Sequence, residues 1–402
     1  MAVDYRALAQ KYDTPLYVYD FNEVAKNYHA VKNAFKARKS LVAYAVKANS
    51  NMSLLKLLAD LGSGADCVSI GEVKRALLAG IPSYKIIFSG VGKRDDEIAE
   101  AIQKDILYIN IESEAEAERV ELIAKELGKV ARVSFRVNPD IDPKTHPYIS
   151  TGLSENKFGV DIETAKKLYL FAKKSPYLLP VGIHFHIGSQ LTQLEPIKEA
   201  SAIVAELAKS LQKIDIDLKF FDVGGGLGIR YKDEKTIEPY DYAQAILSTL
   251  SGTDYTIVTE PGRFIVGNAG VFLTRVLYEK QTASKRFIIV DGAMNDLLRP
   301  SLYDAYHEVE VVGKNGDATL ADVVGPVCES GDFLAKDRLL PKTEHGDLIV
   351  VKSAGAYGFV MSSNYNTRPR PAEVALEDGK DRLIRERESF EYIIEKEIRF
   401  MV

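Results

Sequence analysis

A lysine ends an apolar run near the start of the chain. Lys47 follows the residues LVAYAV, and the polar residues 49–51 come soon after it. A charged amine is costly to bury, so a lysine in this position is either paired or used chemically. A strand-end lysine whose amine reaches water is the common structural interpretation. The functional interpretation is a neutral amine that attacks a carbonyl group.

Three glycines end another β-rich run, in DVGGGLGI. The spacing differs from the G-x-G-x-x-G of dinucleotide-binding folds. Glycines let backbone N–H groups approach an anion closely, whereas a tight turn is the alternative explanation. Ser189 and Arg263, which end neighbouring runs, favour a phosphate site formed with Gly224, Gly225 and Gly226.

Two histidines and an acid end further runs. Alternation in GIHFHI places His184 and His186 on one face. We interpret His184 as a hydrogen-bonded core residue, and His186 as a ring that could stack on an aromatic ligand. No carboxylate or cysteine near HFH completes a metal-ligand set, so no metal site is predicted. Glu260 ends the apolar TIVTE and needs a cationic partner, either Arg263 or a protonated ring nitrogen.

The elements that position these residues alternate in type between about residues 40 and 265. Helical patterns separate eight β-rich runs, which indicates a parallel sheet. A count of eight favours a closed (β/α)8 TIM-like barrel, with an open doubly wound sheet as the alternative. Chemistry in such barrels gathers at the C-terminal strand ends. The runs are LVAYAV, SGADCVS, KIIFSG, ILYINI, ARVSFRV, VGIHFHI, KFFDVGG and YTIVTE.

The pattern changes after residue 270. The remaining strand-like runs are joined by turns and show little helical periodicity, which predicts an antiparallel β domain. The early run TPLYVYD also reads as a strand and is assigned to this domain. We therefore expect a barrel over residues 25–265, and a β-sandwich or β-barrel domain formed by residues 1–24 and 266–402.

The bulk composition excludes several classes of protein. The 402 residues are 46% hydrophobic and 27% charged, which is typical of a globular protein. A net charge of −5 gives no indication of nucleic-acid binding, and two cysteines, Cys67 and Cys328, form no disulfide framework. No apolar run approaches the ~20 residues that span a bilayer, and no signal segment is visible. A soluble cytoplasmic protein without membrane partners is expected.

One cofactor would use all the features at the predicted rim. Pyridoxal 5′-phosphate would use four of them: an amine for a Schiff base, an anion cradle, a flat ring for stacking and an acid for a pyridinium nitrogen. Each feature alone is a weak signal. Their convergence on the C-terminal ends of barrel strands makes this cofactor the prediction.

The same motifs resemble a known family. YAVKAN, HFHIGSQ, DVGGGLG, EPGR, CESGD and GAYG resemble, in order and over nearly the whole chain, the fold-type III (group IV) pyridoxal-phosphate-dependent amino-acid decarboxylases. The resemblance implies a (β/α)8 barrel, a C-terminal β domain and a homodimer with shared active sites. It implies that Lys47 binds the cofactor covalently and that His186 stacks on it. The other implied cofactor contacts are Asp66, Ser189, Gly224, Gly225, Gly226, Glu260, Gly262, Arg263 and Tyr357.

The resemblance also implies a substrate. In LLRPSLY, Arg299 and Tyr303 look like a carboxylate clamp, assisted by Arg263. Glu329 follows Cys328, where ornithine and arginine decarboxylases typically carry aspartate, and would bind the substrate ammonium. These residues, with THPYISTG at 145–152, imply decarboxylation of meso-2,6-diaminopimelate to L-lysine and CO2, the last step of lysine biosynthesis.

The resemblance also implies a proton donor, and it leaves related activities as alternatives. Cys328 of the partner subunit is expected to donate a proton to the carbanion, and Tyr357 to reach both cofactor and substrate. A decarboxylase acting on ornithine, arginine or carboxynorspermidine is the alternative, as is a non-catalytic homologue that binds the cofactor. An alanine racemase does not account for CES. The stretch SENKFG, residues 154–159, has no assigned role.

Overall fold

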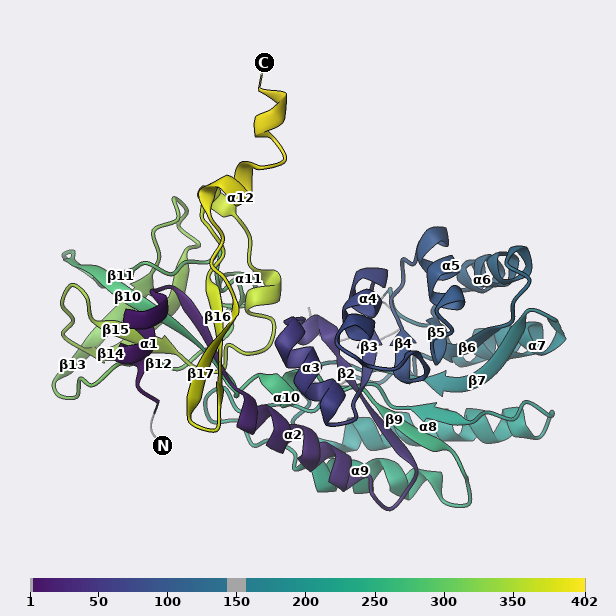
Figure 1. Ribbon diagram of the computed structural model, residues 1–402. Helices are drawn as coiled ribbons and strands as arrows, with labels where there is room; N and C mark the ends of the chain where they lie inside the picture. The colour runs from purple at the N-terminus through teal and green to yellow at the C-terminus, as the bar shows by residue number, and fades with distance from the viewer. Residues whose placement is uncertain (1–2, 143–156, 402) are drawn as a thin grey trace. The chain divides into compact units, whose positions relative to one another are not determined.

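The computed structural model of the chain describes residues 3–142 and 157–401 (Figure 1). These residues form two compact units. The barrel unit consists of the described residues within Ala25–Ile229 and Lys235–Phe264. The β unit consists of the described residues up to Val24, the short segment Arg230–Glu234, and those from Ile265 onward.

Eight parallel strands close into a barrel, which confirms the predicted (β/α)8 fold. The first and last strands pair directly, with Leu41 opposite Val258. Each predicted run supplies one strand because its apolar residues are buried on both sides of the barrel wall. The strands are β2 (Ser40–Ala45), β3 (Gly64–Cys67), β4 (Ile86–Phe88), β5 (Tyr108–Ile111), β6 (Ala131–Arg136), β7 (Leu178–His184), β8 (Phe220–Asp222) and β9 (Thr256–Thr259).

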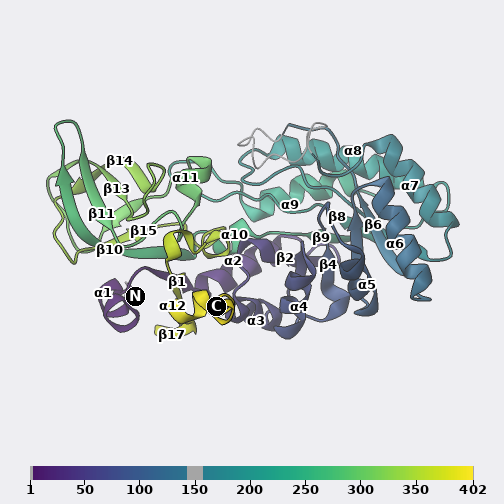
Figure 2. The same ribbon diagram turned by 90° about the horizontal axis from the view of Figure 1, so that it is seen from above.

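Helices cover the outside of the barrel, as both views show (Figures 1 and 2). Several begin at side chains that cap the first turn: Ser69, Ser113 and Asp161 each accept a hydrogen bond from a backbone N–H three residues on. The helices are α2 (Phe21–Ala34), α3 (Met52–Asp60), α4 (Ile70–Leu78), α5 (Asp95–Gln103), α6 (Glu114–Glu126), α7 (Ile162–Lys174), α8 (Leu194–Gln212) and α9 (Pro239–Leu247). The single turn α10 (Arg263–Val266) follows the last strand and crosses the boundary between the two units.

The β unit is built on a nine-stranded sheet. The N-terminal strand lies between β10 and β16, which confirms that the early run TPLYVYD joins this unit. The strands are β1 (Leu16–Asp20), β10 (Gly270–Gln281), β11 (Arg286–Val290), β12 (Val309–Val311), β13 (Ala318–Val324), β14 (Phe333–Pro341), β15 (Leu348–Val351), β16 (Ala372–Glu377) and β17 (Lys380–Arg385).

This sheet is mixed rather than wholly antiparallel. The pairs β1–β16 and β11–β13 are parallel, and the other pairs are antiparallel. The partners in both parallel pairs lie apart in the sequence, and parallel strands need a crossover connection rather than a hairpin. Local turn signals therefore could not reveal these two pairings.

Three helices complete the β unit: α1 (Tyr5–Tyr12), α11 (Arg299–Tyr303) and α12 (Phe390–Ile394). Leu8 and Ala9 of α1 pack on apolar residues of the sheet, among them Leu16 and Val18. Within the described residues of the chain, no helix is long and apolar enough to cross a membrane.

Candidate active site

Lys47 lies at the C-terminal end of the first barrel strand. It sits in a single 3₁₀ turn, Val46–Ala48, directly after β2. Its Nζ lies 2.7 Å from Oδ2 of Asp66 on the neighbouring strand β3. The lysine side chain is 38% exposed, whereas Asp66 is fully buried. Lys47 is thus both paired with a carboxylate and open on one side.

Glu260 follows β9 and is buried beneath this rim. Its Oε2 lies 3.3 Å from Nε2 of His184, the last residue of β7. Burial alone would raise the pKa of Glu260, but the neighbouring His184 ring outweighs it and lowers that pKa to about 2. The charges of Glu260 and Lys47 also interact. Glu260 is therefore held ionised.

Asp222, the last residue of β8, was not predicted as part of the site. Its Oδ2 accepts a hydrogen bond of 2.9 Å from the Tyr108 hydroxyl, and its Oδ1 accepts one of 3.0 Å from the Gly224 N–H. Burial, followed by the negative charge of Glu260, raises the pKa of Asp222 well above its usual value. The pKa values of two adjacent acids are therefore shifted in opposite directions, downward for Glu260 and upward for Asp222.

The expectation that no carboxylate lies near the histidines was wrong. His184, Asp222 and Glu260 each offer a ligand atom, and these atoms lie within 4.8 Å of one another. They come from β7, β8 and the end of β9, which neighbour one another in the barrel but are distant in sequence. The cluster already has internal partners, since Glu260 faces His184 and Asp222 accepts two hydrogen bonds.

His186 lies beyond the end of β7 and is half-buried. Its Nδ1 accepts a hydrogen bond of 3.2 Å from the Gly225 N–H. Burial and the charge of Arg136 lower the pKa of His186 well below its usual value, so the ring is neutral. A neutral imidazole held at one nitrogen keeps a fixed orientation.

The glycine run is explained by close approach of backbone. A Cβ added at Gly225 would lie 2.3 Å from the carbonyl oxygen of Glu260, and one at Gly226 would lie 2.6 Å from that of Gly188. Gly224 has a φ of +63°. These contacts require glycine whether or not an anion binds, so the run alone is weaker evidence for a phosphate site than its sequence suggested.

Side-chain donors gather beside the glycines. Arg263 is buried, and its Nε and Nη2 donate to the Ser189 hydroxyl over 3.2 and 3.0 Å. The pair joins the ends of two strands, as the sequence suggested. Gly262 packs tightly in the same region, because a Cβ there would lie 2.9 Å from Cβ of Ala48.

The barrel unit also contains a buried ion pair that was not predicted from the sequence. Arg136, the last residue of β6, binds Glu112 over 3.2 Å, and Glu112 also accepts the N–H groups of Gly90 and Gly159. The Arg136 guanidinium lies 4.7 Å from the Phe158 ring centroid. The described end of SENKFG, residues 157–159, therefore packs on this ion pair. The remainder of that stretch and THPYISTG lie outside the described residues.

Arg299 and Tyr303 form the two ends of α11 in the β unit. Arg299 is buried, and its Nη1 lies 2.9 Å from Nε2 of His307. Its guanidinium lies 4.7 Å from the ring centroid of Tyr231. Tyr303 is half-buried.

The CESGD loop is tied to the same helix. Ser301 of α11 donates a hydrogen bond of 2.6 Å to the carbonyl of Gly331. Cys328 is exposed, and its N–H donates to Oδ1 of Asn366. Glu329 is exposed and shares a hydrogen bond with Tyr365. The helix and the loop thus form one connected part of the β unit.

Tyr357 of GAYG adopts a backbone conformation that large residues rarely take. Its φ is +57°, in the left-handed region, and its side chain is half-buried. Backbone of this kind persists only where the surrounding structure fixes it, and it is concentrated at functional sites.

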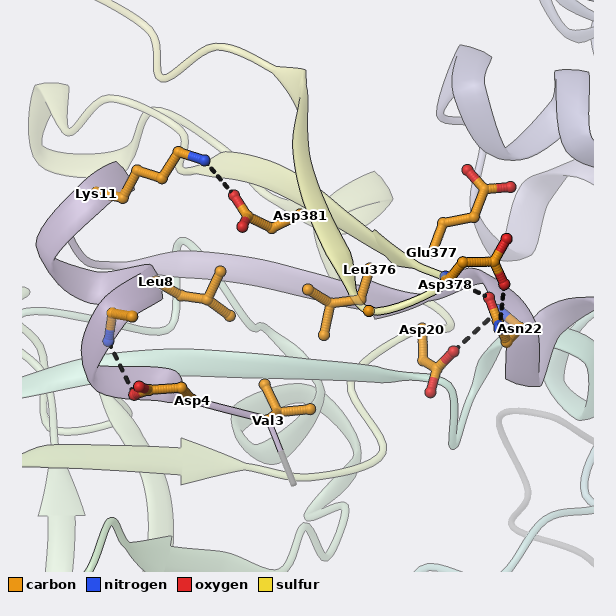
Figure 3. Close-up of a pocket in the computed structure, with 12 residues that line it drawn as sticks. Val3, Asp4, Leu8, Lys11, Asp20, Asn22, Leu376, Glu377, Asp378 and Asp381 are labelled. Carbon is orange, nitrogen blue, oxygen red and sulfur yellow. Dashed lines mark hydrogen bonds and ion pairs between the residues drawn. The ribbon is translucent and has the colours of Figure 1, made fainter. Parts of the chain in front are cut away.

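A pocket elsewhere in the β unit contains none of the predicted residues (Figure 3). It has a volume of about 550 Å³ and lies between α1, the end of β1 and the turn that joins β16 to β17. Several of its polar side chains pair with one another or with the backbone: Lys11 with Asp381, Asn22 with Asp378, and Asp4 with an N–H of α1.

Comparison with known proteins decides the family. Residues 21–267 match the family described as the pyridoxal-binding domain of pyridoxal-dependent decarboxylases. The chain belongs to the pyridoxal-dependent decarboxylases. Membership confirms the resemblance that the sequence motifs indicated, and it makes pyridoxal 5′-phosphate the cofactor.

Individual relatives cover the whole length. The chain is 60% identical over 400 residues to diaminopimelate decarboxylase of Campylobacter jejuni, covering 99% of this chain and 100% of the relative. The crystal structure of diaminopimelate decarboxylase from Helicobacter pylori complexed with L-lysine matches with a TM-score of 0.97 at 56% identity, over 99% and 100% of the two chains. A structure of the M. jannaschii enzyme in co-complex with L-lysine matches with a TM-score of 0.93 at 40% identity, over 97% and 93%.

The residues of the barrel unit fit this cofactor. Among the described residues, Oε1 of Glu260 is buried without a hydrogen-bond partner, and it belongs to an ionised carboxylate suited to a ring N–H donor. Lys47 supplies a primary amine at the rim. Ser189 and Arg263 supply polar side chains suited to a phosphate. The donor set therefore agrees with the family.

Proposed function

We propose that this protein decarboxylates meso-2,6-diaminopimelate to L-lysine and CO2. The observation that carries the proposal is full-length similarity, at 60% identity, to a relative named for this activity. The 0.97 TM-score to a structure complexed with L-lysine, the expected product, supports the same reaction. The predicted substrate residues Arg299, Tyr303 and Glu329 also lie on one helix and the loop bonded to it.

In this proposal the barrel unit holds the cofactor. Lys47 binds it covalently, His186 covers its ring, Glu260 keeps its ring nitrogen protonated, and Ser189 with Arg263 binds its phosphate. When bound, the cofactor supplies a ring that accepts the electron pair released when the bond to CO2 breaks. Asp66 pairs with the Lys47 amine and so fixes its position. Gly224, Gly225, Gly226 and Gly262 shape the backbone around the phosphate.

In this proposal the β unit binds the distal end of the substrate. Arg299 and Tyr303 bind the distal carboxylate, Glu329 binds the distal ammonium, and Tyr357 contacts both cofactor and substrate. Charge-assisted contacts of this kind contribute roughly 1.5–3 kcal/mol each in a closed site. Arg263 was also expected to help bind the substrate. Its hydrogen bonds to Ser189 support its role at the phosphate, and its part in binding the substrate stays a prediction.

Cys328 is proposed as the proton donor to the carbon that loses CO2. Its exposure on the CESGD loop is compatible with service to a site on a second copy of the chain. We accordingly propose a homodimer with shared active sites. The dimer rests on the family resemblance, and a cytoplasmic location is proposed from the similarity to a biosynthetic enzyme.

A decarboxylase for ornithine, arginine or carboxynorspermidine is the competing proposal. Glu329, in the place where the ornithine and arginine enzymes typically carry aspartate, argues against the first two. The non-catalytic alternative is disfavoured because Lys47 and Cys328 are both present. A lysine/ornithine decarboxylase from Vibrio vulnificus matches at 23% identity, which shows the shared fold alone.

The test is a substrate panel on the purified protein loaded with pyridoxal 5′-phosphate. Lysine and CO2 should form in equal amounts from meso-diaminopimelate, and CO2 should form barely or not at all from ornithine, arginine and carboxynorspermidine. Lys47→Ala is the matched control, since it removes the amine and should abolish both activity and borohydride-trapped cofactor. Faster release of CO2 from another member of the panel would refute the proposed substrate.

A further inference from the structure

His307 is buried and uses both of its ring nitrogens within the β unit. Its Nε2 lies 2.9 Å from Nη1 of Arg299, and its Nδ1 lies 2.8 Å from the carbonyl oxygen of Lys352. No motif in the sequence marked this histidine. Its position, eight residues after Arg299, does not reveal the contact, because α11 ends between them.

These two partners fix the protonation of the ring. A carbonyl oxygen only accepts, so Nδ1 must carry the proton. A guanidinium only donates, so Nε2 must present its lone pair. The histidine is therefore neutral and in a single tautomer. A second proton on Nε2 would place N–H against N–H and one positive charge against another.

The carbonyl that orients the ring is itself fixed by the sheet. Strands β12 and β15 pair antiparallel, and beyond the ladder the Lys352 N–H donates to the Glu308 carbonyl over 2.8 Å. The backbone at Lys352 therefore cannot move without breaking the end of this pairing. A rigid connection runs from the sheet through the His307 ring to the Arg299 guanidinium.

Tyr231 supports the same guanidinium from another side. The Arg299 guanidinium lies 4.7 Å from its ring centroid, a cation–π distance. The Tyr231 and His307 rings meet edge to face, with centroids 5.6 Å apart and an interplanar angle of 83°. Tyr231 belongs to Arg230–Glu234, the short segment that groups with the β unit. Tyr231 and His307 thus both contact the Arg299 guanidinium.

We propose that His307 is a positioning residue that holds Arg299 in place for the distal carboxylate of the substrate. This inference rests on the proposed function, because it assumes that Arg299 binds that carboxylate. A long arginine side chain loses rotamer freedom when it binds, and a fixed side chain has lost that freedom beforehand. A neutral acceptor also orients the guanidinium without cancelling its charge, whereas a carboxylate in the same place would weaken its attraction for the substrate.

Two variants separate orientation from folding. His307→Leu removes both ring nitrogens, whereas His307→Gln retains an acceptor oxygen that can reach Arg299. The full-length protein loaded with pyridoxal 5′-phosphate is assayed for kcat and KM with meso-diaminopimelate. His307→Leu should raise KM roughly 10-fold or more with a smaller effect on kcat, and His307→Gln should restore most of that loss. The absorbance of the bound cofactor should stay unchanged in both variants.

Two inhibitors show whether the effect concerns a carboxylate. L-lysine keeps one carboxylate, and cadaverine keeps none. His307→Leu should weaken inhibition by L-lysine about as much as it raises KM for the substrate, and should change inhibition by cadaverine less than about 2-fold. Equal weakening of both inhibitors would show a general structural role and would overturn the inference.

A double variant tests whether His307 acts through Arg299. Arg299→Ala should lower kcat/KM by roughly 10²-fold, and adding His307→Leu to it should cause little further loss. Full additivity would overturn the inference, as would a well-folded His307→Leu protein with wild-type KM. Wild-type protein that is inactive on meso-diaminopimelate would instead refute the proposed function, and with it the role assigned here.

Discussion

Glu260 and Asp222 are adjacent acids whose pKa values are shifted in opposite directions, and each shift makes a different prediction. Burial favours the neutral form of Asp222, and Asp222→Asn supplies a neutral amide of nearly the same shape, so we expect cofactor affinity and kcat within about 5-fold of wild type. Glu260→Gln removes a charge that the proposed chemistry uses, so kcat should fall by roughly 10²-fold or more. Both are measured by steady-state kinetics and cofactor titration.

The control for this pair is Asp222→Ala. It leaves the Tyr108 hydroxyl and the Gly224 N–H without their acceptor, and it should therefore weaken the site more than Asp222→Asn does. A large loss in Asp222→Asn, equal to that in Asp222→Ala, would mean that Asp222 is needed as an anion.

Asp296 makes the stability of the β unit depend on pH. Burial raises its pKa to about 7, from an ordinary value of 3.8. Between these values the folded state keeps a proton that the unfolded state has lost. Its stabilising contribution is therefore complete below about pH 4 and declines as the pH rises through 7, by about 1.4 kcal/mol per pH unit at most.

Asp296→Asn removes this titration. The free energy of unfolding of the variant and of the wild type is measured in urea at about pH 5 and at about pH 7.5. The difference between the two proteins should change by about 2 kcal/mol in favour of the variant as the pH rises. Other titrating groups cancel in the difference between the two proteins. A difference that stays constant with pH would show that Asp296 titrates near its ordinary value.

At the scale of elements, the ends of β8 and β9 approach so closely that only glycine fits. A Cβ at Gly225 would overlap the Glu260 carbonyl at 2.3 Å, and that oxygen belongs to backbone, which cannot rotate away. Gly225→Ala should therefore lower the free energy of unfolding by roughly 2–4 kcal/mol, even without the cofactor.

Gly92→Ala is the matched control for this substitution. A Cβ at Gly92 meets no atom within 4 Å, and its φ needs no glycine, so stability should change by less than about 1 kcal/mol. Thermal or urea unfolding of the two proteins without cofactor gives the comparison. Equal stability of the Gly225→Ala and Gly92→Ala proteins would mean that the backbone near Gly225 can shift to accept a Cβ. Glycine would then be needed there for anion binding rather than for folding.

Helices and strands could be predicted where a local sequence pattern marked them. The eight barrel strands could be read from apolar runs between helical patterns, and the N-terminal strand was assigned to the β domain. Side-chain interactions between strands carried no such signal. The Tyr108 hydroxyl of β5 reaches Asp222 of β8, which is not a neighbouring strand, over a sequence separation of 114 residues. Arg136 meets Glu112 at the ends of the neighbouring strands β6 and β5, over a separation of 24 residues. Neither contact could be found before the pairing and curvature of the strands were known.

The β unit shows the same limit. The motif LLRPSLY singled out Arg299, but His307 and Tyr231 were missed, since one follows the helix and the other lies in a short segment after the glycine run. An arginine in a motif marks the group that meets a ligand. The residues that orient it are set by tertiary packing, which composition and spacing do not encode.

At the scale of the whole molecule, the proposed homodimer with shared sites predicts complementation. Each active site would combine the barrel unit of one copy with Cys328 of another. Lys47→Ala and Cys328→Ala are each inactive in this arrangement, but a hybrid dimer contains one site with both residues intact. Random exchange of equal amounts should restore about a quarter of wild-type activity, because half of the dimers are hybrid and each has one working site.

The matched control is a mixture of Lys47→Ala and Glu260→Gln. Both changes lie in the barrel unit, so every site of their hybrid contains one damaged barrel, and activity should not return. Subunit exchange is verified with differently tagged chains, and decarboxylation of meso-diaminopimelate is measured before and after mixing. If exchange occurs and both mixtures stay inactive, Cys328 serves the site of its own chain or does not deliver the proton. Recovery in the first mixture alone would require two copies to build one site, because no other combination brings an intact Lys47 and an intact Cys328 together.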